Sequence, residues 1–93
     1  MELKQLRDEI DSIDDQLMPL LERRMQLSKL VAEYKLERNL PIYVPEREQQ
    51  ILACISQRVS PEIAGYIESL YVSLFEISKS YQADLHHLHG NNP

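Results

Sequence analysis

The chain has 93 residues, of which 15 are acidic and 10 are basic, so its formal net charge is −5. A charged fraction of 27% and an apolar fraction of 43% are typical of a folded chain and exclude the disordered and fibrous classes. No run of Lys or Arg interleaves with aromatic residues, so nucleic-acid binding is excluded as well.

Residues 3 to 38 carry a continuous apolar seam and contain no glycine. This spacing predicts one heptad-like helix, about 54 Å long at 1.5 Å per residue. A helix of that length cannot bury its seam against the rest of its own chain, so we predict a dimer. The seam residues step alternately by three and four: Leu3, Leu6, Ile10, Ile13, Leu17, Leu20, Arg24, Leu27, Val31 and Tyr34.

Pro19 lies inside this first helix. A proline there removes one backbone hydrogen bond and clashes with the carbonyl four residues back, at a cost of roughly 3 kcal/mol. We therefore expect a kink at Pro19 rather than a break.

Two prolines mark the starts of a second and a third helix. Asn39 is expected to end the first helix, and Pro45, followed by acidic residues, opens a second that runs to about Arg58. Ser60 as N-cap and Pro61 in the first turn open the third helix, which continues to residue 90. The sequence therefore predicts an all-α fold of a long, a short and a long helix.

The chain has one cysteine and no long apolar segment. Cys54 cannot form an internal disulfide and has no Cys or His nearby at metal-ligand spacing. The first ten residues lack a signal-peptide core, and no segment is long enough to span a bilayer. We expect a reduced, cytoplasmic protein outside the membrane, with a single domain over residues 1–93.

Polar side chains interrupt the apolar faces of all three helices. Arg24 takes a seam position, and Lys35, eleven residues later, returns to nearly the same face after about three turns. Glu48 lies on the apolar face of the second helix, and Ser78 and Gln82 are four residues apart on the third. Because an unpaired buried charge costs several kcal/mol, these residues indicate a polar site. A structural ion pair of Arg24 with Glu48, beside a solvated Lys35, remains open.

Two further polar features lie away from that group. Arg7 precedes Arg24 by 17 residues, about 25 Å along the helix axis, which is too far to share a site within one straight helix. In an antiparallel dimer Arg7 could reach the site of the partner chain. His86, His87 and His89 lack a complete ligand set, so we predict no metal site and a frayed, solvated tail.

Taken together, these residues resemble the all-helical class of chorismate mutases over residues 3–85. The most specific pieces are the spacing of Arg24 from Lys35 and the segment LPIYVPERE, residues 40–48, with the Ser78 and Gln82 pair as a weaker one. The resemblance implies an intertwined homodimer that converts chorismate to prephenate in aromatic amino-acid biosynthesis. It implies no cofactor and no metal.

The resemblance also implies a role for each site residue. Arg24 and Arg7 of the partner chain would hold the substrate carboxylates, Lys35 and Gln82 would contact the ether oxygen, and Glu48 would accept from the ring hydroxyl. Two residues would supplement these contacts: Arg47 and Ser78. Val44 departs from the family pattern, because relatives often carry an acidic residue at this position. A valine is tolerated there if the backbone makes the contact.

Three alternatives stay open from the sequence. The related isochorismate-pyruvate lyases share the fold and the cationic site, but the lyase pattern lacks an acidic residue such as Glu48 directly after Arg47. A non-catalytic helical dimerisation or regulatory module would use the seam charges only to set register. The chain could also be a mutase domain of a fused aromatic-pathway enzyme, although its end HGNNP has the composition of a free terminus.

Overall fold

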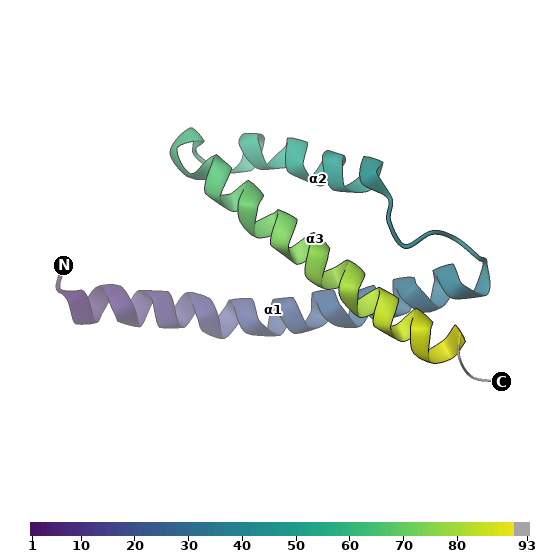
Figure 1. Ribbon diagram of the computed structural model, residues 1–93. Helices are drawn as coiled ribbons and strands as arrows, with labels where there is room; N and C mark the ends of the chain where they lie inside the picture. The colour runs from purple at the N-terminus through teal and green to yellow at the C-terminus, as the bar shows by residue number, and fades with distance from the viewer. Residues whose placement is uncertain (91–93) are drawn as a thin grey trace.

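The computed structural model describes residues 1–90, without the side chains of residues 88–90, and these residues form three helices (Figure 1). Helix α1 spans Leu3–Glu37, α2 spans Pro45–Arg58 and α3 spans Pro61–Gly90. The predicted all-α fold of a long, a short and a long helix is confirmed. The residues predicted to follow the third helix, 91–93, lie outside the described part. No helix within the described part is long and apolar enough to cross a membrane.

The end of α1 is set by a left-handed residue. Asn39 has a φ of 54°, a conformation that Asn tolerates better than most side chains because its short polar group bonds locally. The turn lets the amide of Leu40 donate to the carbonyl of Lys35 at 2.9 Å, which satisfies one of the open carbonyls of the last turn. The predicted terminator is therefore the residue that turns the chain toward α2.

Both later helices begin at a proline, as predicted. Pro45 follows Val44, whose carbonyl accepts the first helical bond from the amide of Arg47 at 3.1 Å. Pro61 follows Ser60, whose carbonyl accepts from the amide of Ile63 at 3.1 Å. Proline fits these starts because its φ is already helical and the first turn needs no amide donor from it.

Pro19 does not break α1, which is assigned as one helix through that position. Figure 1 draws α1 as one uninterrupted helix, so the prediction that Pro19 does not break it is confirmed. Pro19 is exposed, and water can reach the carbonyl that loses its partner there. The helix therefore continues across the proline.

Helix α3 packs against both of the other helices, crossing the C-terminal half of α1 and running beside α2 (Figure 1). The buried apolar residues are few: Ala32 from α1, Ile55 from α2 and Phe75 from α3. Tyr71 meets Phe75 edge-on, with ring centroids 6.1 Å apart. The remaining buried side chains are polar, and they belong to the site described below.

The N-terminal half of α1 extends beyond α2 and α3 (Figure 1), and the apolar side chains of its seam are exposed. Ile13 and Leu20, for example, are 61% and 65% exposed. The radius of gyration is 16.9 Å, against about 12 Å for a compact domain of this length. The accessible surface is 7619 Å², against about 5600 Å² for a compact monomer of 10.9 kDa. The chain therefore exposes far more surface than a self-contained domain of its mass does, and many large apolar side chains are part of that surface.

Candidate active site

A cavity of about 500 Å³ opens between α1, the segment that leads to α2, the start of α2 and the C-terminal half of α3. This volume lies in the range of small-molecule sites. Seven of the eight site residues predicted from the sequence line it: Arg24, Lys35, Val44, Arg47, Glu48, Ser78 and Gln82. The other lining residues are mostly apolar: Leu27, Ser28, Val31, Ile42, Ile51, Phe75 and Lys79.

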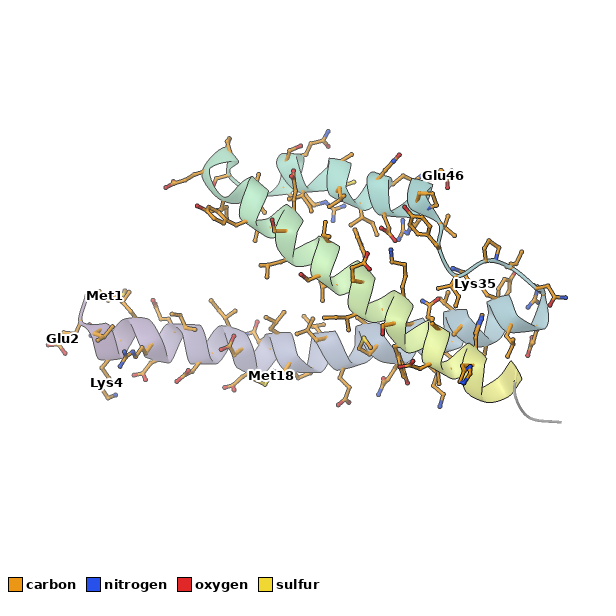
Figure 2. The ribbon with its side chains drawn as sticks, in the orientation of Figure 1. Met1, Glu2, Lys4, Met18, Lys35 and Glu46 are labelled. Carbon is orange, nitrogen blue, oxygen red and sulfur yellow. The ribbon has the colours of Figure 1, made fainter. Side chains whose placement is uncertain are left out.

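Lys35 brings a half-buried ammonium to the cavity. Its Nζ donates to the carbonyl of Ile42 at 2.8 Å, which ties the end of α1 to the segment before α2 (Figure 2). Burial lowers the pKa of Lys35, because the charged form loses part of its hydration. The ammonium has three N–H donors, so two remain for a ligand after the bond to Ile42.

Gln82 brings a buried hydrogen-bonding group, without a partner in the described part of the chain, to the cavity wall. Its side chain is 7% exposed, and its Oε1 is buried with no hydrogen-bond partner among the described residues. A half-turn of the amide exchanges this oxygen for the NH₂ group, so the side chain can accept or donate at that position. Since buried amides are normally paired, a ligand in the cavity would supply the missing partner.

Two serines on facing helices form a buried hydrogen bond beside Gln82. The Oγ atoms of Ser28 on α1 and Ser78 on α3 lie 2.6 Å apart. One hydroxyl donates and the other accepts in this bond, which joins α3 to α1 one turn before Gln82. Ser78 therefore positions the wall of the cavity and also lines it.

The cavity carries an excess of positive charge. Its lining contains four cationic side chains and one carboxylate: Arg24, Lys35, Arg47, Lys79 and Glu48. Glu48 is paired with Lys79, whose Nζ lies 3.1 Å from Oε2 of the carboxylate. The alternative of a structural ion pair between Arg24 and Glu48 is therefore wrong. The arrangement suits an anionic ligand, because three cations remain without a carboxylate of their own in the cavity wall.

Arg7 is the predicted site residue that this chain does not bring to its own cavity. It lies on the exposed part of α1 between Lys4 and Met18, at the end opposite Lys35 (Figure 2). A distance of about 25 Å along the axis separates it from Arg24. Its place in a site of the partner chain stays a prediction.

One of the histidines near the end of α3, His86, contacts α1. Nε2 of His86 lies 2.7 Å from the carbonyl oxygen of Ala32, which joins α3 to α1. The expectation of a frayed, solvated tail is wrong for His86, because α3 still packs on α1 at this point. The residues within the described part include no cluster of side chains able to hold a metal ion. The side chain of His89 lies outside that part.

Two polar lining residues escaped the sequence analysis. Ser28 follows Arg24 by four residues and so shares its helix face, a signal that spacing could have given. Lys79 directly follows Ser78, and nothing in the sequence marks it as a partner of Glu48 across two helices. Its role depends on how α2 and α3 pack, which single-helix periodicity does not encode.

The fold and the cavity define a class of protein: an all-helical domain with a cation-rich cavity, of small-molecule size, between its helices. Residues 6–83 match the family described as chorismate mutase type II. The chain belongs to this family.

Three relatives illustrate the match. A bifunctional chorismate mutase/prephenate dehydratase of Aquifex aeolicus (strain VF5) is 48% identical over 64 residues, 69% of this chain and 17% of that protein. A chorismate mutase of Methanocaldococcus jannaschii is 43% identical over 49 residues, 53% of this chain and 50% of that protein. A 4-amino-4-deoxychorismate mutase of Streptomyces venezuelae is 31% identical over 78 residues, 82% of this chain and 72% of that protein.

The chain thus spans less than a fifth of the Aquifex relative and half of the Methanocaldococcus relative. No solved structure matches it significantly.

Proposed function

We propose that the chain is a chorismate mutase, which rearranges chorismate to prephenate in the cavity described above. Family membership supports the reaction. The observation that carries the proposal is that Lys35 of α1 and the buried amide of Gln82 of α3 line the same cavity. The reaction breaks one carbon–oxygen bond and forms one carbon–carbon bond within a single molecule. It requires no nucleophile, proton transfer, cofactor or metal.

The charges of the cavity support binding of a dicarboxylate. Arg24, together with Arg7 of the partner chain, holds the two carboxylates, and Arg47 and Ser78 supplement these contacts. Glu48 accepts a hydrogen bond from the ring hydroxyl. Binding in this frame selects the compact conformer in which the reacting carbons approach each other, so part of the entropic barrier is removed before the reaction starts.

Rate acceleration follows from the groups placed at the ether oxygen. As the carbon–oxygen bond breaks, negative charge grows on that oxygen. The Lys35 ammonium and the Gln82 amide donate to it, and both bonds become stronger in the transition state than in the ground state. Preorganised donors of this kind lower the barrier because they need no reorientation when the charge appears.

The proposed functional unit is an intertwined homodimer. Supporting it are the open seam of α1, the 16.9 Å radius of gyration and the large accessible surface of the single chain. Two chains with antiparallel α1 helices would cover each other's seams and would carry Arg7 of each chain to the other's cavity. We also propose a cytoplasmic location, in keeping with the lone Cys54, which cannot form a disulfide within the chain.

Product analysis separates the mutase from its nearest rival. Purified chain is incubated with chorismate and, separately, with isochorismate, and the products are identified by mass and by chromatography against standards. We expect prephenate from chorismate and no salicylate or pyruvate from isochorismate. Salicylate and pyruvate without prephenate would assign the lyase instead. If neither substrate gives a product, the chain would be assigned as a non-catalytic binding or dimerisation module.

The pH dependence of the reaction follows from Lys35. Because burial lowers the pKa of Lys35 from its ordinary value of 10.5, the free enzyme loses the required ammonium as the pH rises through the lowered pKa. We expect kcat/KM to stay level across neutral pH, since the Gln82 amide donates at every pH. It then falls on the alkaline side, with a midpoint below 10.5.

The Lys35→Arg variant is the matched control for this profile, because guanidinium stays charged to above pH 12. Whatever its absolute rate, this variant is expected to lose the alkaline decline seen in the wild-type chain. Activity confined to acidic pH in the wild-type chain would contradict the assignment of donors. So would an identical alkaline midpoint in Lys35→Arg.

A further inference from the structure

Lys79 on α3 makes three close contacts at the edge of the cavity. Its Nζ lies 3.1 Å from Oε2 of Glu48 on α2 and 3.0 Å from Oε1 of Glu76, one turn earlier on α3. The same Nζ lies 4.3 Å from the centroid of the Tyr43 ring, in the segment before α2. One side chain thus joins α3, α2 and the connecting segment.

The contacts of Lys79 leave little of its ammonium for a ligand. Two of its three N–H donors are directed to carboxylates, and the aromatic face of Tyr43 covers another side. The hydrogen bond with Glu76, followed by the contacts with Glu48, raises the pKa of Lys79, so the side chain stays charged at neutral and moderately alkaline pH. In this structure the ammonium of Lys79 therefore binds neighbouring side chains and leaves little of itself for a ligand.

The neighbour that matters for the site is Glu48. A carboxylate in a cavity for a dianion repels that ligand unless a cation offsets its charge. Lys79 supplies this cation. The charges of Arg24, Lys35 and Arg47 are then not needed to offset Glu48 and remain available to the ligand. The ion pair also holds Oε2 of Glu48, which leaves the other carboxylate oxygen with both of its lone pairs to accept a hydrogen bond.

We infer that Lys79 is a positioning residue of the site: it compensates and orients the Glu48 carboxylate so that one oxygen accepts from the ring hydroxyl of the ligand. The inference rests on the proposed function, in which Glu48 contacts that hydroxyl. It assigns Lys79 a part in binding chorismate and prephenate, both of which carry the hydroxyl, and no part at the ether oxygen.

A double-mutant cycle tests the coupling of Lys79 to Glu48. The Kd for prephenate and the kcat and KM for chorismate are measured in the wild-type chain, Lys79→Met, Glu48→Gln and the double variant. Lys79→Met is expected to weaken prephenate binding and raise KM by about tenfold, the loss typical of one hydrogen bond to a charged group, with a smaller change in kcat. In the Glu48→Gln background, Lys79→Met is expected to alter Kd by less than about twofold, because the carboxylate that pairs with Lys79 is absent.

Two further variants separate charge from packing. Lys79→Arg keeps the cation and is expected to retain most of the affinity. Glu76→Gln removes the exposed second carboxylate of the same lysine and is expected to change Kd and KM by less than about twofold, since the contact with Glu48 persists. Thermal melting of each variant shows that the chains compared are folded.

Three results would overturn the inference while leaving the proposed function intact. They are an equal loss of affinity from Lys79→Met in both backgrounds, a loss in Lys79→Arg as large as in Lys79→Met, or a loss of that size in Glu76→Gln. A wild-type chain that neither forms nor binds prephenate would instead overturn the proposed function, and the inference that rests on it would fall as well.

Discussion

Replacing Lys35 or Gln82 by alanine is expected to lower kcat for chorismate by about 10²–10³-fold, the cost typical of removing one preorganised donor from a developing oxyanion. The Lys35→Ala variant lacks the half-buried ammonium, and the Gln82→Ala variant lacks the buried amide. Both groups lie in the wall of the same cavity. Because each donor acts more strongly in the transition state than in the ground state, the loss should fall on kcat more than on KM. Steady-state rates of prephenate formation measure it.

Lys29→Ala is the matched control for the lysine variant. Lys29 lies on α1 two turns before Lys35 but is exposed and does not line the cavity. We expect its kcat to stay within about twofold of the wild-type value, in line with the small effects of surface substitutions. Unchanged turnover in both Lys35→Ala and Gln82→Ala, with folded chains, would remove these residues from the reaction.

Mixing two inactive variants is expected to restore activity. Arg7→Ala chains lack the arginine that they would contribute to the cavity of a partner chain. Lys35→Ala chains lack the ammonium of their own cavity. In a heterodimer of the two, one cavity contains Lys35 and receives an intact Arg7, whereas the other lacks both. Random exchange between chains of a two-fold dimer should therefore recover about a quarter of the wild-type activity per chain.

The recovery depends on chain exchange, which must be measured in the same sample. Chains of different mass, one of them tagged, report the fraction of heterodimer by native mass spectrometry. An Arg24→Ala chain mixed with Lys35→Ala serves as the control, because both changes affect cavities built from one chain and every site stays damaged. Confirmed exchange without recovery would contradict the transfer of Arg7 across the interface.

The helix boundaries were largely predictable because they depend on local chemistry. Asn39 ends α1 through its own left-handed backbone, and Pro45 and Pro61 begin α2 and α3. Pro19 was correctly predicted not to break α1, which continues through it, since the exposed position leaves the lost hydrogen bond to water.

The candidate site was predictable where it depends on helix faces. Arg24 and Lys35 share one face of α1, and Ser78 and Gln82 share one face of α3, so periodicity alone grouped them. The family resemblance supplied the reaction and the role of each residue. The structure adds the cavity that unites these faces.

What the sequence could not predict are contacts set by helix crossing. The bond between Ser28 and Ser78 requires α3 to pass α1 at one register, and the ion pair between Lys79 and Glu48 requires α2 to lie at a certain height along α3. Both depend on the packing of a small core around Phe75. Arg7 remains the residue whose place depends on a second chain.

The most direct test of the proposed function is the conversion of chorismate by purified chain that has been dialysed against a chelator and assayed without any added cofactor. We predict that prephenate forms at a rate proportional to chain concentration, and that adding divalent metal leaves this rate unchanged, because Lys35, Gln82 and the arginines suffice for the rearrangement. No prephenate above the uncatalysed background, or prephenate only after a metal is restored, would contradict the proposed function.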